Sequence, residues 1–381
     1  MDTSRRDLYG SLQVLFPADS EPTDRERLEA AKGPLLSWYR KHKRDLPWRR
    51  SGDAYKIWIS EIMLQQTRVE AVKPYFARFM ERFPDVAALA SALEEELFKY
   101  WEGLGYYSRA RNLKKTAEIL MEEYGGKLPA SREKLLSLPG IGSYTAGAIA
   151  SIAYGIPAPA VDGNVLRVLA RVTGSREDIL KQSTRRKMEE LVTGILREGE
   201  AGDLNQALIE TGAVICIPNG EPLCGECPFH TVCAAREKGM TGEIPVRQAR
   251  KKRKIEEKTV LFMTYGDKIA IRKRESEGLL ASLYEFPNLC GHLPEEDVRA
   301  LFPFPVRLEA AEPSRHIFSH TEWHMTCYRI FFSRLPGTEE LEKLPGGILF
   351  AEREELKSRY AVPSAFAAYK KFLDQRQEES I

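Results

Sequence analysis

The segment from Leu138 to Val172, LPGIGSYTAGAIASIAYGIPAPAVDGNVLRVLARV, restricts the fold of this chain more than any other segment. Gly140 and Gly142 follow a short helical pattern over Glu133 to Ser137, so the chain must turn tightly there before a second helix starts near Tyr144. Glycines at such a turn leave backbone N–H groups accessible at a helix start, which is an arrangement that holds a phosphate. The segment predicts two helices joined by a hairpin.

A carboxylate follows this hairpin at the start of a third helix. The second helix is rich in small residues and is followed by Asp162, after which Val165, Val168 and Leu169 continue an apolar pattern. A turn between helices is often only a turn, and an aspartate in front of a helix is commonly an ordinary N-cap. The order of the three features nevertheless resembles the helix-hairpin-helix DNA glycosylases, whose motif ends in a catalytic aspartate. Asp162 holds that position.

A second acidic candidate lies in an apolar helical pattern from Tyr55 to Thr67. On one face of that helix, Glu61 falls in a stripe with Trp58 and Ile62. Burial disfavours the charged form of a carboxyl group and raises its pKa, so a buried Glu61 would donate a proton near neutral pH. From this segment alone, a glutamate paired with a nearby arginine is an equally good interpretation.

The composition limits the class of protein. A chain of 381 residues with 43% hydrophobic and 29% charged residues is long enough for two globular domains. The net charge is only +2, so binding to nucleic acid must depend on local patches. The first residues lack a secretory pattern, and no stretch approaches the roughly 18 apolar residues of a membrane helix. We expect a monomer that does not associate with membranes. Its expected location is the cytoplasm, of the bacterial type, where it would be associated with the nucleoid.

The periodicity divides the chain. Residues 1–23 and 377–381 are expected to be tails, residues 24–245 to form a helical domain, and residues 246–257 to be a basic linker, for which nuclear import is the less favoured interpretation. The period then changes to two, as in the alternating runs at 260–264 and 315–332, and a helix over 364–374 follows. Residues 258–376 are therefore predicted to be an α+β domain.

Four of the six cysteines lie between positions 216 and 233, separated by seven, two and five residues. Such bunching in an intracellular chain argues against a disulfide framework and predicts a metal site. The four thiolates could hold tetrahedral zinc or a cubane iron–sulfur cluster, and the spacing does not choose between them. The residues of this candidate centre are Cys216, Cys224, Cys227 and Cys233.

Five motifs together resemble the adenine DNA glycosylases of the MutY type, over nearly the whole chain beyond the first tail: SEIMLQQTRV, GLGYYSRARNL, LPGIGSYTAGAI, VDGNV and RHIFSH. The resemblance implies a mainly α catalytic region with the helix-hairpin-helix glycosylase fold, made of a six-helix module and an iron–sulfur module. A C-terminal α+β Nudix-like domain would follow it. The resemblance also implies a [4Fe-4S] cluster on the four cysteines. A structural monovalent or divalent cation at the hairpin is a candidate for an additional bound ion.

The same resemblance implies the roles of the catalytic residues. Glu61 would protonate the departing adenine at N7, and Asp162 would stabilise or trap the oxocarbenium-like sugar. Tyr144 stands where glycosylases that also nick the strand carry a Schiff-base lysine, so the enzyme is expected to be monofunctional. In the family the matching tyrosine orients the catalytic aspartate. The other pocket residues implied are Asn164 and Arg49, with Arg44, Leu46 and Trp48 around the adenine.

The implied partner is duplex DNA that contains adenine opposite 8-oxoguanine, or opposite guanine, and excision there would prevent G·C to T·A mutation. The adenine must be flipped out of the duplex, which takes a few kcal/mol and less at a mismatch. The implied DNA-binding positions are Gln66, Thr67, Leu104 and Tyr106 beside the lesion, Gly140 and Gly142 at a phosphate, and Phe318, Ser319 and His320 in the loop that distinguishes 8-oxoguanine from guanine.

Several alternatives compete with this interpretation. One is a relative that takes thymine from G·T mismatches or a bifunctional pyrimidine glycosylase, and another is an iron–sulfur DNA-binding protein without activity. A zinc site from His316, His320 and His324, placed on one strand face, is less favoured. The first cysteine gap is seven residues where the family usually has six. The C-terminal part lacks an REx2EEx run, so nucleotide hydrolysis there is not expected.

Overall fold

The computed structural model of the chain describes residues 21–248 and 252–375. Most of the predicted N-terminal tail and the whole C-terminal tail therefore lie outside the described residues. The described chain forms two compact units, one made of residues 21–90 and 115–248 and the other of residues 91–114 and 252–375. Residues 91–114, which were predicted to belong to the helical domain, form part of the C-terminal unit.

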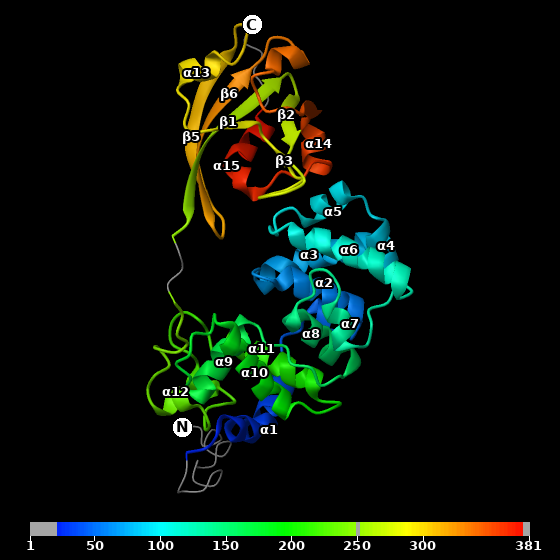
Figure 1. The fold of residues 1–381 in the computed structure, drawn as a ribbon, viewed down its shortest axis with the longest axis vertical. Coiled ribbons are helices and arrows are strands. Elements are labelled where there is room, and N and C mark those ends of the chain that lie inside the picture. The colour runs from blue at the N-terminus through cyan, green and yellow to red at the C-terminus, as the bar shows by residue number, and fades with distance from the viewer. Residues whose placement is uncertain (1–20, 249–251, 376–381) are drawn as a thin grey trace, which may run out of the picture. The chain divides into compact units, whose positions relative to one another are not determined.

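The first unit is helical, as predicted, and its elements can be followed in Figure 1. None of the described helices is both long enough and apolar enough to cross a membrane. The elements of this unit are α1 (Asp24–His42), η3 (Pro47–Arg49), α2 (Ala54–Leu64), α3 (Val69–Arg82), α4 (Val86–Ser91), α7 (Arg132–Leu136), α8 (Ser143–Tyr154), α9 (Gly163–Thr173), α10 (Gln182–Ile195), α11 (Ala201–Val214), η4 (Cys224–Glu226) and α12 (Ala234–Glu237), while α6 (Ser108–Glu123) begins in the other unit.

The helix starts follow local capping chemistry. Thr23 and Glu26 form a capping box at the start of α1. The Asp53 carboxylate accepts N–H bonds at the start of α2, and the Ser131 hydroxyl does the same for α7. Asp162 caps α9 in the same way. The helix–hairpin–helix predicted over Leu138 to Val172 is therefore present, with α8 starting one residue earlier than predicted.

A close approach of two backbones fixes the segment that leads to Asp162. A Cβ atom added at Gly147 in α8 would lie 1.9 Å from the carbonyl oxygen of Pro159. The amide of Asn205 in α11, which has no exposed surface, accepts from the N–H of Ala160 at 3.1 Å and donates to the carbonyl of Ala158 at 2.8 Å. The small residues of α8 therefore allow the chain to return close to that helix.

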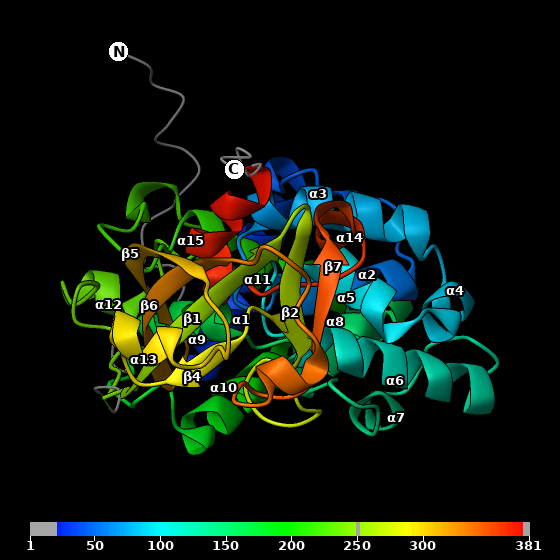
Figure 2. The ribbon, with the colours of Figure 1, turned by 90° about the horizontal axis from the view of Figure 1, so that it is seen from above.

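The second unit contains a mixed sheet with the order β3-β2-β1-β6-β5, in which β1 pairs in parallel with β6 and antiparallel with β2 and β4. Figure 2 shows β7 beside β2, with which it pairs. The prediction of an α+β domain is confirmed. Its elements are α5 (Glu94–Trp101), β1 (Lys254–Tyr265), β2 (Lys268–Lys273), β3 (Tyr284–Glu285), β4 (Asn288–Cys290), α13 (Glu295–Arg299), β5 (Arg307–Ile317), β6 (Thr321–Phe331), η5 (Thr338–Leu341), β7 (Ile348–Glu352), α14 (Arg353–Ser358), η6 (Ser364–Phe366), α15 (Ala367–Lys370) and η7 (Lys371–Asp374).

Three predicted boundaries in this unit need correction. Strand β1 begins at Lys254, so the last residues of the predicted linker 246–257 belong to the sheet. The predicted run 315–332 is two strands, β5 and β6, with a turn between them. The prediction missed the turn because it contains no glycine or proline and the alternation continues on both sides of it. The predicted helix 364–374 is a succession of η6, α15 and η7.

Gly147→Ala is expected to lower the free energy of unfolding by about 1–3 kcal/mol, because the added methyl group forces two backbones apart. Urea denaturation of the whole chain measures this difference. Gly33→Ala in α1 is the matched control: its Cβ would meet nothing within 4 Å, so helix propensity alone should stabilise by up to about 1 kcal/mol. Equal effects of the two substitutions would contradict the close approach at Gly147.

Candidate active site

Glu61 is a buried carboxyl group on α2. Glu61 is only 8% exposed. The hydroxyl of Tyr144 on α8 donates a hydrogen bond of 2.6 Å to Oε2 of Glu61. Helices α2 and α8 pack against each other, which brings the two side chains together. The predicted burial of Glu61 is confirmed. Its hydrogen-bond partner is a tyrosine, not the arginine that the alternative interpretation required.

The surroundings of Glu61 favour its protonated form. Burial raises the pKa of Glu61 to about 7; the Tyr144 hydrogen bond lowers it, the charge of Asp162 raises it and the charge of Arg49 lowers it. The same burial raises the pKa of Tyr144 well above its ordinary value. A carboxyl group with a pKa near 7 can donate a proton at neutral pH, which is the property that general acid catalysis requires.

Asp162 sits at the N-terminus of α9. Its Oδ1 accepts from the N–H of Asn164 at 2.9 Å and of Val165 at 2.8 Å, and its Oδ2 accepts from the side-chain amide of Asn164 at 3.0 Å. Burial raises the pKa of Asp162, while these hydrogen bonds and the charge of Arg167 lower it. The net shift is upward, so the helix N-terminus offsets burial only in part. The hydroxyl of Tyr144 donates to Glu61, and the orienting role toward Asp162 that the resemblance implies for Tyr144 stays a prediction.

A chain of hydrogen bonds links Asp162 to the cysteine segment. The Oδ1 of Asn164 accepts from Nη2 of Arg167 at 2.9 Å, and Nε of Arg167 donates to the carbonyl of Cys216 at 2.8 Å. Helix α11 comes close here, since a Cβ at Gly212 would lie 2.7 Å from Cβ of Asn164. Arg167 is buried, so these contacts fix Asn164 beside the aspartate.

Sequence reasoning missed a buried glutamate on α11. Glu210 has no exposed side-chain surface and pairs with Arg44 and Arg49. Its position in LIETGAV carries the same signal that identified Glu61, a carboxylate within an apolar helical stretch, and could have identified it. One cavity is lined by six of the predicted site residues, Arg44, Leu46, Trp48, Arg49, Glu61 and Tyr144, together with residues such as Gln206 and Ile209; Asp162 and Asn164 are not among its lining residues.

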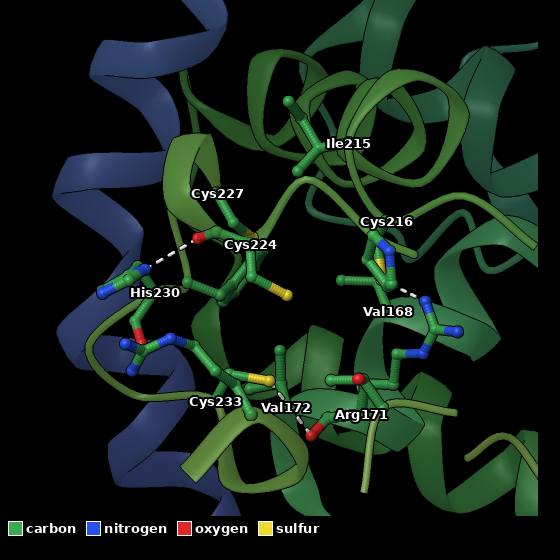
Figure 3. Close-up of a pocket in the computed structure, with 13 residues that line it drawn as sticks. Val168, Arg171, Val172, Ile215, Cys216, Cys224, Cys227, His230 and Cys233 are labelled. Carbon is green, nitrogen blue, oxygen red and sulfur yellow. Dashed lines mark hydrogen bonds between the residues drawn. The ribbon is translucent and has the colours of Figure 1, made fainter. Parts of the chain in front are cut away.

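The four cysteines of the candidate metal centre line one pocket together with residues of α9, as Figure 3 shows. Arg171 donates from Nη1 to the Sγ of Cys216 at 3.2 Å, and the Sγ of Cys233 donates to the Arg171 carbonyl at 3.3 Å. Burial raises the pKa of Cys227 to about 12, and the other thiolates add to the shift. Within the described residues, no three Cys, His, Asp or Glu side chains are grouped closely enough to hold a single metal ion.

Two predicted DNA-binding segments have unusual backbone conformations. Gln66 follows α2 with a φ of 59°, and Tyr106 has a φ of 48° in the loop that precedes α6. Tyr106 is 48% exposed and Leu104 is buried, while Tyr107 packs edge-on against a ring of α5. The two adjacent tyrosines therefore differ: Tyr107 belongs to the core, and Tyr106 is half-exposed. Thr67 directly follows Gln66, next to the start of α3.

The hairpin glycines have the conformations that the turn requires. Gly140 has a φ of 76°, in the left-handed region that favours glycine, and Gly142 is the N-cap of α8 without a side-chain cap. The N–H groups in the first turn of α8 thus have no competing cap side chain. The predicted binding of a phosphate at this helix start stays a prediction.

The predicted lesion loop forms the turn between β5 and β6. Within the second unit, the hydroxyls of Tyr106 and Ser319 lie 3.0 Å apart, and Phe318 packs edge-on against Trp323. Phe318, Ser319 and His320 line one cavity with residues 103–108. The zinc alternative is wrong, because its histidines do not share a strand face: His316 pairs with Trp323, so His324 points to the opposite side and His320 lies in the turn.

Comparisons with known proteins identify both units. The family model of the HhH-GPD superfamily base excision DNA repair proteins matches residues 59–193, and that of the NUDIX domain matches residues 259–374. A solved structure of a thermostable thymine-DNA glycosylase is 30% identical, with a TM-score of 0.51 over 56% of this chain and 98% of that one. Fold and site thus define a DNA glycosylase of the helix-hairpin-helix class with a C-terminal Nudix-like domain.

Curated relatives make the assignment narrower. The adenine DNA glycosylase of Homo sapiens is 34% identical over 87% of this chain and 72% of its own length, and that of Mus musculus is 32% identical over 91% and 79%. That of Buchnera aphidicola (Schizaphis graminum) is 37% identical over 67% and 73%. The chain belongs to the adenine DNA glycosylase family. It is an enzyme of base excision repair that binds DNA, so the non-enzymatic alternative is excluded.

Proposed function

We propose that this enzyme hydrolyses the N-glycosidic bond of adenine paired with 8-oxoguanine, and also with guanine, and leaves the DNA strand intact. The observation that carries the proposal is the buried, protonatable Glu61, hydrogen-bonded to Tyr144 and close enough to Asp162 to be affected by its charge. Two carboxyl groups in different environments can divide acid and charge-stabilising roles between them. We expect the enzyme to act as a monomer.

The proton would come from Glu61. An adenine inside the duplex is out of reach, so it must leave the base stack and enter the cavity of η3, α2 and α8. There, Glu61 would protonate N7 of the base and make it a neutral leaving group. Its raised pKa of about 7 keeps a large fraction of the acid form at neutral pH.

The positive charge on the sugar would meet Asp162. As the glycosidic bond breaks, the sugar becomes oxocarbenium-like, and a carboxylate beside it stabilises that charge or traps it covalently. A water molecule then adds to the sugar carbon, which completes the hydrolysis and frees the carboxylate. Asn164 and the first N–H groups of α9 orient the Asp162 carboxylate through three hydrogen bonds. Arg167 in turn orients Asn164.

Strand cleavage by a Schiff base is not expected. That reaction needs a nucleophilic amine next to the sugar, and the matching position is Tyr144, whose hydroxyl donates to Glu61. The product should therefore be an abasic site in an intact strand.

The four cysteines suit a [4Fe-4S] cluster as resident group. They come from one short segment, surround one pocket and include no disulfide. Cys216, Cys224, Cys227 and Cys233 would hold the cluster, which would cross-link this segment beside α9. The cation at the hairpin stays a prediction; the carbonyl of Pro139 there already accepts from Thr116.

Recognition of the opposite base would depend on the β5–β6 turn. Ser319 lies within hydrogen-bond distance of the exposed Tyr106, so a hydroxyl donor and an aromatic ring stand next to each other at one cavity. A ring on a loop can enter a base stack, and a hydroxyl can bind the altered edge of 8-oxoguanine. Phe318 and His320 complete this turn.

Single-turnover excision on four duplexes tests the reaction. Wild-type enzyme should release adenine opposite 8-oxoguanine and guanine but should leave T·G and oxidised pyrimidines, and strands should break only after alkali treatment. Asp162→Asn should reduce excision by at least about 10³-fold, because the sugar cation loses its counter-charge, while DNA binding persists. Thymine release, breaks without alkali, or an active Asp162→Asn would refute the proposal.

The double variant Ser319→Ala with His320→Ala should reduce the preference for 8-oxoguanine over guanine by about tenfold, the effect of losing one or two hydrogen bonds to the base. Competition binding with the two duplexes measures it. Leu335→Ala, an exposed residue of the same unit away from the turn, is the control. An unchanged preference in the double variant would argue against the assigned role of the turn.

A further inference from the structure

Glu210 is a fully buried carboxylate in the second-last turn of α11. It accepts four hydrogen bonds: from Arg44 through the backbone N–H at 3.1 Å, Nε at 2.6 Å and Nη2 at 3.0 Å, and from Nη2 of Arg49 at 2.8 Å. Burial alone would raise the pKa of Glu210, but the two arginines outweigh it and the pKa is lowered. Glu210 is therefore a permanent negative charge in the interior of this unit.

The two arginines connect Glu210 to the active site. Arg44 and Arg49 both line the cavity that contains Glu61, and the charge of Arg49 acts on Glu61. The guanidinium of Arg49 also donates to the carbonyl of Arg44 and lies 5.9 Å from the ring centre of Tyr39. Glu210 itself is absent from the residues that line this cavity, so it can act on Glu61 only through its partners and through space.

The charged and titratable groups around this pair come from several elements. Glu61 is affected by Tyr144 of α8, by Asp162 at the start of α9 and by Arg49 of η3. The arginine pair is affected by Glu210, and Arg44 also by Glu70 of α3. Tyr39 of α1 is affected by the charges of Arg49, of Glu210 and of Asp203 on α11. Among these, Glu210 is the carboxylate that bonds directly to both arginines.

We propose that Glu210 is a positioning residue of the excision reaction: it holds Arg44 and Arg49 at the pocket and balances their charge, so that Glu61 keeps its proton at neutral pH. The inference rests on the proposed role of Glu61 as the general acid. Glu210 is paired with Arg49, whose charge acts on Glu61. Without Glu210 this cation would be uncompensated and would stabilise the ionised form of Glu61 more strongly. A nearby charge of this kind shifts a carboxyl pKa by on the order of one unit or more.

The test is the pH dependence of single-turnover excision at saturating enzyme, on the duplex from which the wild type releases adenine fastest. The rate should fall as pH rises through the pKa of the acid. Glu210→Gln should move this falling limb about one unit toward lower pH. Above the limb, the variant should be about tenfold slower than wild type, and at pH 5.5 it should be similar. A limb that stays in place overturns the proposal.

Three further variants separate charge balance from a merely structural effect. Glu210→Asp retains the charge, so its limb should stay near that of the wild type even if the rate changes. Arg49→Gln removes the cation whose charge acts on Glu61 and should move the limb upward. If Glu210→Gln does not fold, an unmoved limb in Arg49→Gln overturns the proposal. Glu285→Gln in the second unit is the matched control, since Glu285 is also fully buried between Arg272 and Arg274. Its limb should not move.

Glu61→Gln separates failure of this inference from failure of the proposed function. If Glu61→Gln keeps the wild-type rate and limb, Glu61 is not the acid and both proposals are wrong. If Glu61→Gln loses excision while Glu210→Gln keeps the wild-type limb, only the inference about Glu210 is wrong.

Discussion

Burial of acidic side chains in a helical pocket is the constraint on which the active site depends. Glu61, Asp162 and Glu210 are all removed from water, and each is accommodated differently. Glu61 is accommodated by a raised pKa and a tyrosine donor, Asp162 by N–H groups at a helix start, and Glu210 by two guanidinium groups. Because each environment favours one charge state, three similar carboxyl groups can take three different roles in the proposed reaction.

This arrangement requires backbones that approach each other closely. Gly147 admits the segment that precedes Asp162, and Gly212 admits Asn164, so neither position has room for a side chain. Asn205 then ties that segment to α11 with hydrogen bonds in the interior. The small residues of the helix-hairpin-helix segment thus allow Asp162, at the start of α9, to lie near Glu61 on α2. The same helix α11 supplies Glu210.

Much of this was predictable from local patterns. Helical periodicity, the caps at Ser131 and Asp162 and the burial of Glu61 follow from residues close in sequence, and the cysteine spacing predicts a metal centre. The pairing of Glu210 with Arg44 was not predictable, because 166 positions separate the two residues and no local signal connects them. The turn at 318–320 lacks the glycine or proline that would mark it, so the strand pattern seemed continuous there.

Glu61 is proposed to hold a proton near neutral pH because it is buried. Infrared difference spectra of wild type minus Glu61→Gln, recorded across pH, isolate the carboxyl C=O band of this one residue. This band is expected to disappear around the raised pKa of Glu61, about 7. A band that is already gone by about pH 5, as for an ordinary glutamate, would contradict it.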